Sequence, residues 1–160
     1  MIAPAAVKFN TENYIFGTTY RSTMALKGYP PTTEDLALLY RLSEMSGVNI
    51  RDVYADDLPY RPEMIVSDVS FISLTYVIPV IARIAAPQAQ IVLLVKPQFE
   101  VGKGNLGKNG IVESRELRER ALTSVVACAE RNGLDVRATT VSPIEGTHGN
   151  IEYLLYAVMQ

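Results

Sequence analysis

The stretch Gln90-Ile91-Val92-Leu93-Leu94-Val95, followed directly by Lys96-Pro97, decides the class of fold. Its continuous apolar run is typical of a β-strand that is covered on both faces. Strands of this kind occur in α/β sheets, where helices pack against a mainly parallel sheet. The run is much shorter than the roughly 20 apolar residues that a membrane-spanning helix needs.

Helix and strand patterns alternate around this strand. Apolar spacing and caps predict helices from Glu34-Asp35 to Gly47, over 71–85 with Pro79 inside, and from the cap Ser114 to about Asn132. The expected strands are 48–53, 64–68, 90–95, 134–141 and 151–159. Only about nine residues join the last two strands, too few for a crossover helix, so the final strand is expected to run antiparallel.

Composition narrows the class of protein further. The chain has 160 residues, 48% of them hydrophobic and 20% charged, with a net charge of −2. These values are typical of one globular domain and exclude a strongly basic nucleic-acid arm. A single cysteine and a single histidine disfavour a disulfide framework and a metal site. We expect one domain over 1–160 in a soluble, cytoplasmic protein, without a membrane span or a bound metal.

The front of the chain follows no regular pattern. Residues 1–31 show no helical period and end in the breaker Gly28-Tyr29-Pro30-Pro31, so we expect an irregular amino-terminal segment there. A complete strand–helix–strand unit needs about 30 residues or more. We therefore expect the sheet to be incomplete in its amino-terminal half.

Three charged residues are placed to meet at one edge of the predicted sheet. Asp68 ends one strand, Lys96 ends the next, and Glu152 begins the antiparallel last strand. Ligands of open parallel sheets bind at the carboxyl edge of the strands, so the three side chains predict a site there. The alternative is that they are three unrelated loop charges.

Aromatic residues accompany two of these charges. Phe71 follows Asp68 and Phe99 follows Lys96, each three residues on. Aromatic rings at such a site could form a wall for a planar ring or a base. The alternative is that both rings belong to the core and close the edge of the sheet.

Three motifs resemble those of the haemolysin-A (TlyA) group of FtsJ-like RNA methyltransferases. Residues 66–74 (VSDVSFISL) resemble the group's aspartate motif, and residues 95–100 (VKPQFE) with 107–112 (GKNGIV) resemble its lysine motif. Residues 142–146 (SPIEG) with 149–152 (GNIE) resemble its glutamate motif. The resemblance covers about residues 47–160 and implies a Rossmann-like class I methyltransferase fold.

The resemblance also implies an activity, which is S-adenosylmethionine-dependent methylation of ribose 2′-hydroxyls in ribosomal RNA. Asp68, Lys96 and Glu152 match the second, third and fourth members of the family's Lys-Asp-Lys-Glu set, and Lys8 is the candidate for the first. Asp68 and Glu152 would hold and tune Lys96, which helps to draw off the hydroxyl proton. For Lys8, the alternative is an exposed terminal lysine.

Further residues are candidates for binding the cofactor and the RNA. Asp68, Asn49 and Phe71 are the candidate cofactor contacts, with a plain solvent-facing strand residue as the alternative for Asn49. Phe99, Lys103 and Lys108 are the candidate RNA contacts, since lysines in a glycine-rich lid would face phosphates. The alternative for that loop is a merely solvated segment.

Two departures from the family leave a second function open. The glycine-rich turn of the cofactor site is not evident, and Gly17-Thr18-Thr19 is only a distant match. The amino-terminal RNA-binding domain usual in the family is also not recognised. The alternative function is therefore a catalytically degenerate or truncated relative that serves as an RNA-binding or assembly module. An uncovered sheet edge would also favour a homodimer.

Overall fold

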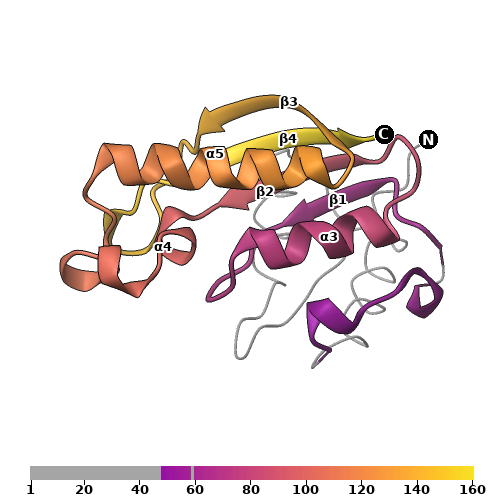
Figure 1. The fold of residues 1–160 in the computed structure, drawn as a ribbon, viewed down its shortest axis with the longest axis horizontal. Helices are drawn as coiled ribbons and strands as arrows, with labels where there is room; N and C mark the ends of the chain where they lie inside the picture. Colours follow the sequence, from indigo (N-terminus) through magenta and orange to yellow (C-terminus); the bar gives the residue numbers. More distant parts are fainter. Residues whose placement is uncertain (1–47, 59) are drawn as a thin grey trace, which may run out of the picture.

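The computed structural model describes residues 48–58 and 60–160. Their centre is a four-stranded sheet in the order β1-β2-β4-β3 (Figure 1). The strands are β1 (Met64–Ser67), β2 (Gln90–Val95), β3 (Leu134–Val141) and β4 (Tyr153–Met159). The α/β fold class expected from the alternating pattern is confirmed.

The directions of the strands bring several loops to one edge. β1 pairs with β2 in parallel, whereas β4 pairs antiparallel with both β2 and β3. The expected antiparallel last strand is therefore confirmed. Because β4 runs opposite to its neighbours, its first residue lies at the edge where β1, β2 and β3 end.

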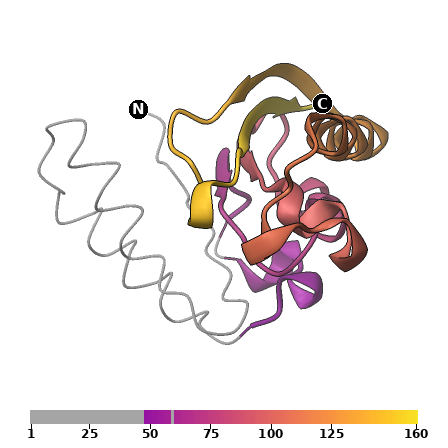
Figure 2. The same cartoon turned by 90° about the vertical axis from the view of Figure 1, so that its left-hand side faces the viewer.

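Two long helices cover the same side of the sheet (Figures 1 and 2). Helix α3 (Leu74–Ile84) joins β1 to β2, and α5 (Arg115–Arg131) lies between β2 and β3 in the chain. Each has a serine cap: Ser73 Oγ accepts from Thr75 N, and Ser114 Oγ accepts from Leu117 N. A side-chain oxygen at this position satisfies a backbone N–H that has no partner within the helix.

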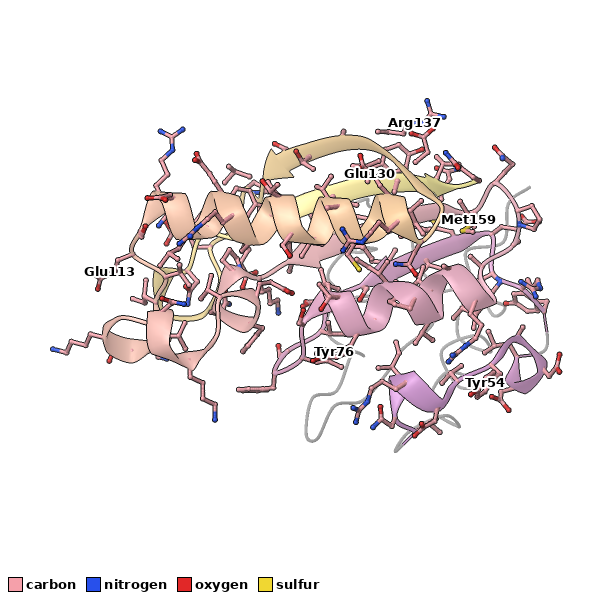
Figure 3. All side chains as sticks on the ribbon, viewed as in Figure 1. Tyr54, Tyr76, Glu113, Glu130, Arg137 and Met159 are labelled. Carbon is pink, nitrogen blue, oxygen red and sulfur yellow. The ribbon has the colours of Figure 1, made fainter. Side chains whose placement is uncertain are left out.

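The core lies between these helices and the sheet. Ile78, Ile81 and Ile84 of α3 are fully buried, as are Ile91 and Leu93 of β2. On α5 the buried residues are Ala121, Val125, Cys128 and Ala129. Cys128 therefore faces the core from its helix. On the outer side of α3, Tyr76 is exposed (Figure 3).

The predicted strand over 48–53 is wrong. Those residues contain a 3₁₀ helix, η1 (Ile50–Asp52), in which the Asn49 side chain accepts from Arg51 N. Ile50 and Val53 are both buried. A spacing of three residues places both on one side of a 3₁₀ turn, whereas in a strand it would place them on opposite faces. Arg83 of α3 completes the arrangement, since its Nε donates to Val53 O at 3.1 Å.

Short elements occupy the segments expected to be loops. Helix α4 (Pro97–Glu100) follows β2, and two 3₁₀ turns follow it, η3 (Lys103–Asn105) and η4 (Lys108–Gly110). Two further 3₁₀ turns are η2 (Ala55–Asp57) and η5 (Thr147–Gly149). The last strand begins at Tyr153, two residues later than expected.

β1 and β3 are the outer strands of the described sheet. The second half of β3 is exposed, and Arg137 projects outward beside it (Figure 3). A homodimer through a sheet edge stays a prediction, as does the single-domain organisation of the whole chain. Within the described ranges, no helix has the length and apolar character to cross a membrane.

Candidate active site

The carboxyl edge of the sheet carries an ion pair between two motifs. Lys96 follows β2 directly, and its Nζ lies 2.6 Å from Oδ1 of Asp68, which follows β1. The lysine side chain is 14% exposed and the aspartate side chain 32%. Lys96 Nζ also donates to Ser70 Oγ at 3.3 Å. The flexible lysine is therefore held from two positions of the loop after β1, with its charge compensated at close range.

Glu152 lies on the strand next to Lys96. Val95 of β2 pairs with Tyr153 of β4, so Lys96 and Glu152 occupy the positions one step beyond that pair. Directly opposite positions of an antiparallel pair present side chains to the same face of a sheet. The structure thus places all three predicted charges at one edge. Lys96 forms its ion pair with Asp68, whereas it is related to Glu152 by strand register.

Glu152 is a buried carboxylate, 5% exposed. Its Oε1 accepts a hydrogen bond of 2.9 Å from Gln98 Nε2. Gly146 packs against the same carboxyl group, because a Cβ built at position 146 would lie 2.5 Å from Glu152 Cδ. A buried carboxylate needs a hydrogen-bond donor, which Gln98 supplies here. Because Gly146 has no side chain, the Glu152 carboxyl group has room beside position 146.

Phe71 stands out from the loop between β1 and α3. It has φ +62°, a left-handed conformation that is rare for residues other than glycine, and it is 80% exposed. Its ring centroid lies 5.1 Å from that of Phe99, with a tilt of 50° between the rings. The alternative that Phe71 is a core residue is wrong. Backbone strain combined with an exposed aromatic ring is typical of a functional position.

Glu100, the last residue of α4, binds the beginning of α3. Its Oε2 accepts from Ser73 Oγ at 2.6 Å, and its Oε1 accepts from Leu74 N at 2.8 Å. Burial raises the pKa of this carboxyl group, whereas the hydrogen bonds from Ser73 and Leu74 act in the opposite direction. The loop that carries Lys96 is thereby attached to the loop that carries Asp68.

The glycine-containing segment after α4 carries the candidate RNA lysines. Lys103 and Lys108 are both exposed, each at the start of a 3₁₀ turn. Asn150 attaches the end of this segment to the glutamate motif. Its Oδ1 accepts from Val112 N at 3.1 Å, and its Nδ2 donates to Gly110 O at 3.2 Å.

The remaining candidates are Asn49, His148 and residues outside the described ranges. Asn49 caps η1, where its side-chain Oδ1 accepts from N and Nε of Arg51. Lys8, the helix expected from Glu34-Asp35 and the segment Gly17-Thr18-Thr19 lie outside the described residues. His148 is exposed in a turn, as expected for an isolated histidine there.

Sequence reasoning missed Gln98, Glu100 and Gly146 as members of the site. All three belong to motifs that were recognised, which was the one available signal. The hydrogen-bond partners of Glu100 and Gln98 lie 26 and 54 residues away in the chain, so no local pattern could reveal those contacts.

Proteins of known sequence and structure resemble this chain. The 16S/23S rRNA (cytidine-2′-O)-methyltransferase TlyA of Mycobacterium tuberculosis is 39% identical over 116 residues, which are 72% of this chain and 43% of that protein. Hemolysin A of Brachyspira hyodysenteriae is 37% identical over 129 residues, 76% of this chain and 54% of that protein. The chain thus spans about half the length of these curated relatives.

Two solved structures are similar as well. Both are described as a "putative hemolysin". The one from Lactococcus lactis has a TM-score of 0.70 at 33% identity and covers 72% of this chain and 56% of that chain. The one from Streptococcus thermophilus has a TM-score of 0.72 at 28% identity and covers 96% of this chain and 70% of that chain.

The family model of FtsJ-like methyltransferases matches residues 6–158. The match includes the three motifs at the sheet edge, and it begins ahead of residue 47, where the expected resemblance begins. The resemblance to the haemolysin-A group is confirmed by the curated relatives. The fold agrees with this match, and so does the edge of the sheet that gathers Asp68, Lys96 and Glu152. The chain belongs to the FtsJ-like methyltransferase family.

Proposed function

We propose that this chain is the catalytic part of an S-adenosylmethionine-dependent methyltransferase that modifies ribose 2′-hydroxyls of ribosomal RNA. The observation that carries the proposal is the Lys96–Asp68 ion pair of 2.6 Å at the carboxyl edge of the sheet. Support comes from the family and from relatives whose names specify rRNA 2′-O-methylation. Action on ribosomal RNA implies a cytoplasmic location.

The residues present fit the proposed cofactor, which supplies a methyl group activated by a sulfonium cation. Asp68 offers a partly exposed carboxylate at the edge where α/β sheets bind their ligands. A carboxylate in this position attracts a cation. Phe71 offers an exposed ring beside it, suited to a planar group. Asn49, as a contact for the adenine, remains part of the proposal.

The reaction joins the 2′-oxygen to the methyl carbon, breaks the bond between that carbon and sulfur, and releases the hydroxyl proton. We assign acceptance of this proton to the amine form of Lys96. Asp68 and Ser70 orient its Nζ. Asp68 then stabilises the ammonium that forms, because opposite charges attract strongly where water is partly excluded.

We assign to Glu152 a second negative charge at the same edge as Lys96. Its place opposite Lys96 in the strand register supports this role, and Gln98 holds its carboxylate. Lys8 is proposed as the first lysine of the family's set. No bound metal takes part in this assignment, since the sulfonium already activates the leaving group.

The RNA is proposed to meet this edge through aromatic and basic side chains. Phe71 and Phe99 form a tilted pair that can receive a base, and stacking on aromatic rings tolerates any base. Lys103 and Lys108 are exposed on the turns after α4, where they can neutralise phosphates.

Calorimetric titration with S-adenosylmethionine, followed by transfer of a labelled methyl group to ribosomal RNA, tests the proposal. We expect micromolar binding and transfer that Lys96→Ala abolishes. Arg120→Ala is the control, since it removes an exposed charge from α5, outside the three motifs. Absence of binding into the millimolar range, or full activity of Lys96→Ala, contradicts the proposal and favours an RNA-binding module without activity.

A further inference from the structure

We propose that Glu100 is a positioning residue for methyl transfer, which holds the loop of Lys96 and Phe99 against the loop of Asp68 and Phe71. This inference rests on the proposed function. Glu100 does not touch the lysine or the aspartate. It acts at the far end of both loops, where α4 meets the first turn of α3.

The two loops meet along their whole length. At the strand end, Lys96 forms its ion pair with Asp68. In the middle, the ring of Phe99 packs against the ring of Phe71. At the other end, Glu100 binds both the side chain of Ser73 and the backbone of Leu74. Residues 68–74 thus contact residues 96–100 at the beginning, in the middle and at the end of both segments.

Glu100 holds the other loop through two hydrogen bonds that its one carboxylate accepts. Hydrogen bonds to an ionised carboxylate are short and stronger than those between neutral groups, and both bonds of Glu100 measure less than 3 Å. The carboxylate also lies at the amino-terminal end of an 11-residue helix, where the helix dipole favours negative charge.

Helix α4 transmits the position of Glu100 to Lys96. It is a single turn with Lys96 as its amino-terminal cap residue and Pro97 at its first position, which fixes the backbone. Phe99 N donates to Lys96 O at 2.9 Å, and Val101 N donates to Pro97 O at 3.0 Å. Displacement of Glu100 therefore moves Phe99 and the backbone that orients Lys96.

Ser73 links this contact to the start of α3. Its Oγ donates to Glu100 and accepts from Thr75 N. Removal of the carboxylate leaves Leu74 N without its acceptor, so the first turn of α3 and the preceding loop lose a fixed position. That loop carries the strained Phe71, whose left-handed backbone needs support from its surroundings.

Kinetic comparison of Glu100→Ala and Glu100→Gln in the full chain tests the inference. We expect Glu100→Ala to lower kcat at least tenfold, with a change in the KM for RNA of less than threefold. Glu100→Gln should restore kcat to within threefold of the original protein. Its amide oxygen can still accept from Leu74 N, and its amide nitrogen can donate to Ser73 Oγ.

Ser114→Ala is the matched control, because Ser114 caps α5 through one bond of 3.2 Å to Leu117 N. Assays run well below the unfolding temperature of every variant. We expect Ser114→Ala to lower the unfolding temperature and leave kcat unchanged. Equal losses of kcat in Ser114→Ala and Glu100→Ala would show a general effect of weakened helix caps and would overturn the inference.

A second measurement does not depend on turnover. The chain has four phenylalanines, so fluorinated phenylalanine gives few ¹⁹F signals, and Phe71→Leu identifies one of the two of interest. We expect Glu100→Ala to shift the Phe71 and Phe99 signals, and Ser114→Ala to leave them in place. If the original protein transfers no methyl group, the proposed function fails. If the rings stay in place in Glu100→Ala, or its kcat is unchanged, the inference fails.

Discussion

Gln98 donates a hydrogen bond of 2.9 Å to the buried carboxylate of Glu152, 54 residues further along the chain. Gln98 belongs to the one-turn helix after β2, and Glu152 precedes β4. The contact therefore joins the lysine motif to the glutamate motif. It also explains how a carboxylate that is only 5% exposed keeps a polar partner at this edge.

Replacement of Gln98 by leucine should destabilise the fold through this contact. Gln98→Leu leaves the Glu152 carboxylate buried without its donor, which costs about 1–3 kcal/mol. Denaturant unfolding measures the loss. Gln90→Leu is the control, since Gln90 begins β2 and is exposed, and it should change the unfolding free energy by less than about 0.5 kcal/mol. Equal stability of the two variants would show that Glu152 has no need of Gln98.

Gly146→Ala should impair both activity and stability. The new Cβ would overlap the Glu152 carboxyl group, which must then leave its present position. We expect at least a tenfold lower kcat and a destabilisation of about 1–3 kcal/mol, as for other overpacked sites. Gly104→Ala is the control, because a Cβ at position 104 meets nothing within 4 Å. Retention of full kcat by Gly146→Ala would separate Glu152 from the reaction.

Loss of the Lys96–Asp68 pair should affect activity and stability very differently. A partly exposed ion pair contributes about 0.2–1 kcal/mol to stability, whereas proton transfer by a positioned group contributes about 10²- to 10⁴-fold to rate. We expect Lys96→Ala and Asp68→Asn each to lower methyl transfer at least 100-fold while remaining folded. Circular dichroism and thermal unfolding provide the check on folding. Unfolding of either variant at assay temperature would assign the pair a structural role.

The pH dependence of stability should report on Glu100. Burial raises the pKa of this carboxyl group in the folded chain above its usual value of 4.5. Between pH 4.5 and the raised pKa, the folded state binds more protons than the unfolded state. The contribution of Glu100 to stability is therefore present below pH 4.5 and falls as pH rises through the raised pKa.

Glu100→Gln removes this titration. We expect the unfolding free energy of the original protein, minus that of Glu100→Gln, to decrease as pH rises above 4.5 and then to level off. Denaturant unfolding at several pH values from 4 to 7 gives the curve. An increase of the difference with pH would mean that the hydrogen bonds from Ser73 and Leu74 outweigh burial.

Local patterns predicted much of the framework. The continuous apolar run predicted β2 with its observed bounds, and the stretch from Leu134 to Val141 predicted β3. The predicted ends Ser114 and Asn132 are the cap residues of α5, and the next residue, Gly133, has φ +80°. These features depend on side chains a few residues apart, so the sequence alone reveals them.

The pattern was ambiguous over 48–53. Apolar residues alternate there as in a strand, yet the chain forms a 3₁₀ turn. The deciding contacts come from Arg83, whose guanidinium binds the carbonyl groups of Arg51 and Val53. Arg83 is some 30 residues away, so alternation alone could not distinguish the two outcomes.

By itself, the sequence determined the class of fold, the direction of the last strand and the presence of Asp68, Lys96 and Glu152 at one edge. These follow from hydrophobic periodicity and loop length, which are local properties. Only the tertiary structure decided which charges pair, that Phe71 is exposed with a left-handed backbone, and that Gln98, Glu100 and Gly146 support the edge. Those outcomes depend on strand register and on loops distant in the chain, because a hydrogen bond or an ion pair forms only where folding brings its two partners within about 3 Å.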